Sequence, residues 1–165
     1  MNRLNLSLLK SFDKFIPNII IFLFGLIPFF IPFSFQFFMP DFTLCVLYFW
    51  AVYAPEKVSI ALMFIMGLLQ DTHLGLPMGT LALASVALFM SSLSYHQYLA
   101  KKPFILSWLI FGFIVLVTSS FKMSFNVFAL LRPLYTEKFI FEAILTIFSY
   151  PTIAALCFNT YQKFR

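Results

Sequence analysis

The chain has 165 residues, of which 62% are hydrophobic and 10% are charged. Soluble domains carry about 25% charged residues, so this composition cannot cover a water-exposed surface. It excludes a soluble globular protein and predicts one integral membrane domain over residues 1–165. The net charge of +5 comes from basic residues spread over loops and termini. That spread favours a role in membrane topology and argues against a nucleic-acid partner.

The chain begins with a predicted amphipathic lead over residues 1–14, followed by a first span at 18–38. Pro17 suits a first helical turn, and Pro28 and Pro32 are expected to kink the span. The apolar run is 21 residues long and no small-residue cleavage site follows it. We therefore expect a retained span rather than a cleaved signal peptide.

Two short apolar runs come next, over residues 42–54 and 58–69, on either side of Pro55-Glu56-Lys57. A helix rises ~1.5 Å per residue, so each run reaches only about 20 Å across a hydrocarbon core of about 30 Å. They are predicted to be two short membrane helices joined by a turn. The alternative is one long helix that buries Glu56 and Lys57 at its middle, at a cost of several kcal/mol.

Three longer spans are predicted over residues 78–99, 103–121 and 139–158. Lys122 is expected to mark the membrane interface, with an interfacial or re-entrant segment over 123–131. Pro151 is expected to kink the last span.

The distribution of basic residues favours six spans with both termini in the cytoplasm. Three basic residues then lie outside: Lys122, Arg132 and Lys138. Eight lie inside: Arg3, Lys10, Lys14, Lys57, Lys101, Lys102, Lys163 and Arg165. With five spans this asymmetry nearly disappears.

Small residues recur at helical spacing in the fourth span, at Thr80, Ala84, Ala87, Ser91 and Ser94. Such a stripe lets helix backbones approach closely in lipid. We expect it to pack against another span inside the bundle; a partner-binding face is the alternative.

The polar residues predict structure rather than catalysis. Asp71-Thr72-His73 is the closest approach to a catalytic or metal-binding group, and it is interpreted as a polar turn. Asp41 and Asp71 could form an acid–base dyad, but their places at segment ends favour capping. Cys45 and Cys157 lie in apolar runs and are expected to be buried thiols. No catalytic residue, metal site or cofactor is predicted.

The segment from Gly67 to Gly79 predicts a tight turn into the fourth span. Gly75 permits backbone conformations that other residues resist, and Pro77 suits the start of the next helix. Asp71 is expected to accept hydrogen bonds from amides at that helix start.

These segments resemble the MreD family of bacterial rod-shape proteins. The resemblance is carried by Pro40-Asp41, Tyr48-Phe49-Trp50-Ala51, Ala54-Pro55-Glu56-Lys57, Gly67-Leu68-Leu69-Gln70-Asp71 and Gly75-Leu76-Pro77-Met78-Gly79. The family typically has Pro-Leu-Gly where this chain has Pro77-Met78-Gly79. The matching segments cover about a quarter of the chain.

The resemblance implies a non-enzymatic scaffold of the cell-elongation machinery in the bacterial inner membrane. Implied partners are an MreC-like protein, MreB-like actin filaments, RodA-like and penicillin-binding peptidoglycan synthases, and membrane lipids. The implied architecture is all-α with six transmembrane helices, similar to the substrate-binding subunits of energy-coupling-factor transporters. The alternative function is therefore a substrate-binding subunit of a vitamin-type uptake transporter. The residues expected to determine structure or partner binding are Asp41, Pro55, Glu56, Gly67, Asp71, Gly75, Pro77, Gly79, Ala84, Ala87 and Ser91.

Overall fold

The structure is a computed structural model that describes residues 3–31, 39–130 and 136–163. These ranges form six α-helices and contain no β-strand: α1 (Arg3–Leu26), α2 (Phe42–Tyr53), α3 (Ile60–Leu74), α4 (Thr80–Leu99), α5 (Phe104–Leu130) and α6 (Thr136–Lys163). Two short 3₁₀ turns, η1 (Ile27–Phe30) and η3 (Pro55–Lys57), follow α1 and α2. The all-helical class expected from the sequence is confirmed.

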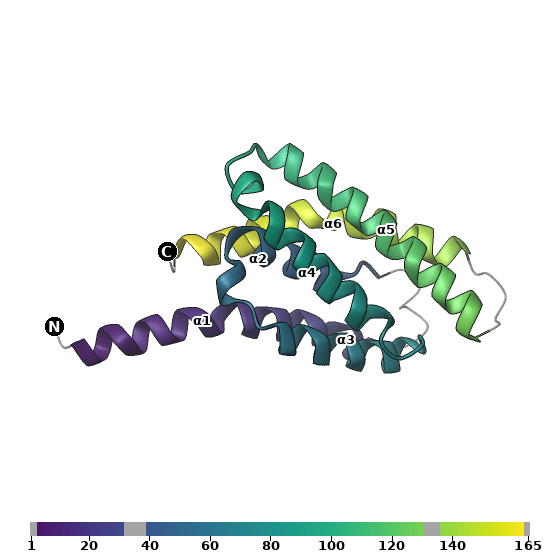
Figure 1. Cartoon of the computed structure of the whole chain (residues 1–165), viewed down its shortest axis with the longest axis horizontal. Helices are drawn as coiled ribbons and strands as arrows, with labels where there is room; N and C mark the ends of the chain where they lie inside the picture. The colour runs from purple at the N-terminus through teal and green to yellow at the C-terminus, as the bar shows by residue number, and fades with distance from the viewer. Residues whose placement is uncertain (1–2, 32–38, 131–135, 164–165) are drawn as a thin grey trace.

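Successive helices run in opposite directions along the molecule (Figure 1). Both chain termini lie at one end, on the left in Figure 1, together with the α2–α3 turn and the α4–α5 connection. We call this the terminal end. The start of α2, the α3–α4 turn, the end of α5 and the start of α6 lie at the opposite end.

Helix α2 forms the centre of the bundle. Ten of its 12 residues are buried, in one unbroken run from Thr43 to Val52. A helix that is apolar on every side must be covered by lipid or by other helices, and α2 is covered by helices, because it packs against α1, α4 and α6. Its Tyr48 ring contacts Phe111 of α5 and Tyr150 of α6, with ring centroids 5.1 and 5.6 Å away. The short apolar run is therefore the core of the fold.

The turn between α2 and α3 is fixed by a side chain from α1. Asn18 donates its side-chain amide to the carbonyl of Lys57 at 3.0 Å, and its amide oxygen accepts from the backbone of Ser59 at 2.9 Å. Pro55 is buried in this turn, whereas Glu56 is exposed. Two short helices are confirmed, and a single long helix over this region is excluded.

Two predictions for the first helix are wrong. Helix α1 begins at Arg3, so the predicted lead and the span form one helix, and Pro17 lies inside it rather than in its first turn. Helix α1 ends at Leu26, and Pro28 lies in the 3₁₀ turn that follows. Pro28 therefore does not kink a longer helix. The expected kink at Pro32 lies outside the described residues.

Two other helices extend further than predicted. Helix α3 runs to Leu74, so Asp71-Thr72-His73 is its last turn rather than a connecting loop. Helix α5 runs on to Leu130, so no separate interfacial segment follows residue 122. Lys122 is only 3% exposed, which corrects the expectation of an interfacial lysine. Pro151 lies inside α6.

Two of the described helical stretches are long and apolar enough to cross a membrane, Phe104–Phe125 and Glu137–Lys163. Shorter apolar helices cover Phe15–Phe30, Phe42–Tyr53 and Ile60–Leu74. The length and composition of the helices therefore support a membrane protein, while the six-span topology stays a prediction.

The small-residue stripe of α4 does not pack as predicted. Thr80 is buried, but Ala87, Ser91 and Ser94 are exposed, because the buried face of α4 is a neighbouring one that includes Ala82 and Phe89. The middle of the stripe, at Ala84, Ala87 and Ser91, instead lines an open cavity of about 490 Å³, which we call the α4–α5 groove. Its walls include Ala84, Ala87 and Ser91 from α4 and Phe113, Val117 and Phe121 from α5.

The close contact of α4 is with α3, at a different pair of small residues. A Cβ atom added to Gly67 would lie 2.5 Å from the Cα atom of Ala82, closer than real Cβ atoms approach a neighbour. Gly67 is therefore required because the two helix backbones touch at this point.

Candidate functional site

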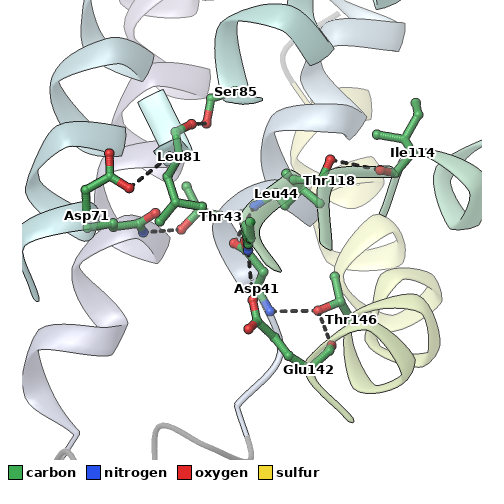
Figure 2. A network of polar contacts seen from close by, with 12 residues as sticks. Asp41, Thr43, Leu44, Asp71, Leu81, Ser85, Ile114, Thr118, Glu142 and Thr146 are labelled. Carbon is green, nitrogen blue, oxygen red and sulfur yellow. Dashed lines mark hydrogen bonds and ion pairs between the residues drawn. The ribbon is translucent and has the colours of Figure 1, made fainter. Parts of the chain in front are cut away.

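A group of charged and polar side chains lies inside the bundle near the end opposite the termini, and Figure 2 shows part of this group. We call this set the polar layer, and its main members are Asp41, Thr43, Gln70, Asp71, Lys122, Glu142 and Thr146. Their hydrogen bonds reach backbone or side-chain groups of all six helices or of the segments that directly flank them. Burying this many polar groups is costly unless each finds a partner, so the partners define what the layer does.

Lys122 is the centre of the layer. Its ammonium nitrogen lies 3.0 Å from Oδ2 of Asp41 and 2.8 Å from Oε1 of Glu142. The Lys122 side chain is 4% exposed, and the two carboxylates are 13% and 17% exposed. One ammonium between two carboxylates thus ties α5 to the start of α2 and to the first half of α6. Because charges in a low-dielectric environment are costly when unpaired, none of the three groups can be removed alone without penalty.

Asp41 also caps α2. Its Oδ1 accepts a hydrogen bond from the backbone amide of Leu44 at 3.1 Å, which satisfies a helix-start donor. Its own backbone amide donates to the hydroxyl of Thr146 at 2.9 Å, and that hydroxyl donates to the carbonyl of Glu142 at 2.7 Å. Figure 2 shows these groups in a chain from α2 to α6. The capping role predicted from its place at a segment end is confirmed.

Asp71 connects α3 to the start of α4. It is fully buried, and its two carboxylate oxygens accept hydrogen bonds from the backbone amides of Gly79 and Leu81, each at 2.8 Å. These amides belong to the first positions of α4, where donors have no partner within the helix and a negative charge is favoured. The predicted role of Asp71 at the entry to the fourth span is therefore confirmed.

The turn between Asp71 and α4 depends on two glycines. Gly75 and Gly79 have φ angles of +65° and +98°, a region that side-chain-bearing residues rarely adopt. Pro77 lies in the turn rather than inside α4, and its carbonyl accepts from both the amide and the hydroxyl of Thr80. The expected special backbone at Gly75 is confirmed, and the helix begins at Thr80, slightly later than expected.

Gln70 and His73 attach the same part of α3 to the end of α1. The Gln70 amide donates to the carbonyl of Gly25 at 3.2 Å and to the hydroxyl of Thr43 at 2.7 Å. The His73 ring lies 2.9 Å from the carbonyl of Pro28 and stacks on Phe29. His73 therefore holds α3 against the 3₁₀ turn that follows α1. No group of three metal-ligating side chains occurs within the described ranges.

A small cavity of about 50 Å³ adjoins the layer and is lined in part by Asp41, Gln70, Lys122, Lys138 and Glu142. Pockets that bind drug-sized molecules measure about 300–1,000 Å³. The cavity has room for small molecules of the size of water, which can complete the hydration of partly exposed carboxylates.

Sequence reasoning found Asp41 and Asp71 but missed that Lys122 and Glu142 join Asp41. The two aspartates have separate partners, so they are not arranged as the acid–base dyad considered above. The sequence feature that could have predicted this cluster is a lysine that interrupts a long apolar run, because a charge inside a span almost always pairs with another charge. The remaining predicted residues Ala84, Ala87 and Ser91 lie away from the layer, in the α4–α5 groove.

An all-helical bundle with two described helices long and apolar enough to cross a membrane, and with an ion cluster in its interior, defines a class of helical protein suited to a lipid environment. Residues 10–159 match the model of a protein family described as rod shape-determining protein MreD. The chain therefore belongs to the MreD family and is a bacterial membrane protein of rod-shape determination. Comparisons with curated proteins and with solved structures gave no match.

Proposed function

We propose that this protein is a non-enzymatic scaffold of the bacterial cell-elongation complex, which directs side-wall peptidoglycan synthesis. In this proposal, all six helices cross the inner membrane and both termini are cytoplasmic. The asymmetry of basic residues supports that orientation. So does the arrangement in Figure 1, in which both termini, the α2–α3 turn and the α4–α5 connection share one end. The polar layer then lies towards the outer side of the membrane.

One observation carries the proposal: the charged groups of the layer are already bound to groups of the same chain. Asp41 and Glu142 share Lys122, and Asp71 is bound by two amides of α4. A catalytic group needs a free position for a reacting atom, whereas these groups fix the relative positions of the helices. Their effect is a bundle whose outer surface is held in one shape, as a binding platform requires.

The α3–α4 turn is the part of that surface best suited to a partner. Asp71 and the two glycines hold the turn in place, and Met78 at its tip is 74% exposed. An exposed, flexible apolar side chain on a rigid turn is typical of a protein contact. We propose that this turn meets a periplasmic MreC-like protein. MreB-like filaments and RodA-like and penicillin-binding synthases are the further partners proposed for the same assembly.

The alternative role as a vitamin-type uptake subunit requires a large outward pocket with converging polar groups. The cavity at the outer side measures only about 50 Å³. No specific observation favours uptake, so the scaffold is the function that we propose.

Depletion of the protein in its host, followed by microscopy, tests the proposal. We expect rod-shaped cells to become round and to lose side-wall incorporation of labelled peptidoglycan precursors, with recovery when the parent protein is restored. Cells that keep their rod shape and their side-wall labelling after depletion would contradict the scaffold role. A growth defect that vitamin supplementation corrects would point to uptake instead.

A further inference from the structure

The α4–α5 groove is an open cavity of about 490 Å³, and none of the main residues of the polar layer lines it. Among the hydroxyl groups that line it, those of Ser91, Ser92 and Thr118 donate to carbonyls of their own helices, at 2.8, 2.9 and 2.8 Å. The groove therefore offers mainly hydrocarbon surface. An occupant must be apolar along the length of the groove.

Two lysines lie just beyond the end of the groove nearest the termini. The groove reaches Tyr95 and Leu99 at the end of α4. Exposed Lys101 and Lys102 follow directly, and the Lys102 ammonium lies 4.7 Å from the centre of the Tyr98 ring. The sequence has no Asp or Glu from residue 72 to residue 136, so no acidic residue of that stretch balances these lysines.

From this combination we propose that the groove binds an anionic phospholipid, with one acyl chain between α4 and α5 and the phosphate at Lys101 and Lys102. The volume falls in the range of binding sites for small ligands, and basic pockets between transmembrane helices suit anionic headgroups. The leaflet assignment rests on the proposed function, because it places the lysines on the cytoplasmic side.

Charge complementarity favours a lipid over a transmembrane helix of a partner. The small wall of α4 could accept a helix backbone. However, the positive-inside rule gives cytoplasmic helix ends an excess of Lys and Arg, which would repel Lys101 and Lys102. A phosphate brings the opposite charge to the same place.

Native mass spectrometry of the full-length protein tests this, after purification in detergent with phosphatidylglycerol or phosphatidylcholine of identical acyl chains. We expect phosphatidylglycerol to be retained about tenfold more strongly. The double change Lys101→Gln and Lys102→Gln should abolish this preference. Lys163→Gln removes a charge from an exposed position outside the groove lining and should leave it unchanged.

Filling the groove provides the second arm. Ala87→Phe should reduce retention of both lipids, and Val117→Trp on the opposite wall gives an independent filling variant if the first fails to fold. Equal retention of the two lipids by the parent protein, or unchanged retention by a folded filling variant, would overturn the proposal. Loss of partner co-purification in filling variants that still retain the lipid would assign the groove to a protein helix. Because lipid retention is measured without any partner, its failure is distinguishable from failure of the scaffold role.

Discussion

Asp41 and Lys122 lie 81 residues apart in the sequence, and their side chains form a 3.0 Å ion pair inside the bundle. Lys122 also binds Glu142, so one buried cation links α5 to the start of α2 and to α6. We therefore expect Lys122→Met to lower the free energy of unfolding by about 3–5 kcal/mol, because it leaves two mostly buried carboxylates without a cation. Denaturant unfolding of the purified protein in detergent measures this change.

The matched rescue is the triple variant Lys122→Met, Asp41→Asn and Glu142→Gln. It removes all three charges, while the amide introduced by Asp41→Asn keeps an oxygen for the α2 cap, so it should recover much of the lost stability. Lys102→Met, at an exposed lysine, is the control and should change stability little. A single variant as stable as the parent would show that the ion pairs do not hold the helices together.

A second prediction concerns Asp71. Asp71→Ala leaves the part-buried amide of Gly79 and the buried amide of Leu81 without an acceptor, at a cost of about 1–3 kcal/mol for the buried amide and less for the other. Asp71→Asn retains one acceptor oxygen and should lie between the parent and the alanine variant. Hydrogen exchange at the first turn of α4 is the measurement, and exchange should accelerate there first. Unchanged protection of these amides in Asp71→Ala would contradict the role given to the carboxylate.

A third prediction compares the effect on stability of replacing two helical glycines, Gly67 and Gly112, by alanine. Gly67→Ala forces a Cβ against the backbone of Ala82 and should cost about 1–3 kcal/mol despite the better helix propensity of alanine. Gly112→Ala is the matched control, because its new Cβ would meet Ile147 only at an ordinary distance of 3.9 Å. Thermal unfolding of both variants should show a lower midpoint for the first and an equal or higher midpoint for the second. Equal effects at the two sites would mean that α3 and α4 are not in close backbone contact.

A fourth prediction follows from the orientation of α4. Ala87 faces the open groove, so Ala87→Phe should fold with near-parental stability. Phe89 is 3% exposed in the core, and Phe89→Ala should cost about 3–5 kcal/mol because it leaves a cavity. Folded yield and melting temperature in detergent distinguish the two. The opposite ranking would place the small-residue stripe inside the bundle, as the sequence pattern first indicated.

The sequence could predict the features that depend on local chemistry. Pro55, followed by the charged residues Glu56 and Lys57, indicates a turn. Gly75 indicates a left-handed backbone position, because few other residues fit there. The sequence also predicts Asp41 and Asp71 as acceptors for helix starts, because unpaired amides at a helix start need an oxygen nearby.

Features that depend on which helix faces lie together could not be predicted. A hydropathy pattern places Lys122 at the membrane interface because it reflects the cost of burying a charge. It contains no information about the carboxylate partners that offset this cost. The spacing of the small-residue stripe shows that its residues share one face of α4. Spacing does not show what covers that face, so the prediction of a packing face was wrong. Helix α4 instead packs through Ala82, whose partner Gly67 lies on another helix.

In the proposed rod-shape scaffold, the rigid α3–α4 turn serves as a partner-binding surface. Photo-crosslinking in living cells from a probe that replaces Met78 tests this claim most directly. The control is the same probe in place of Glu56, an exposed residue in the turn at the opposite end of α3. We expect a crosslink to an MreC-like protein from position 78 and none from position 56. A fully expressed probe at 78 that gives no such crosslink, or equal crosslinks from both positions, would contradict the account.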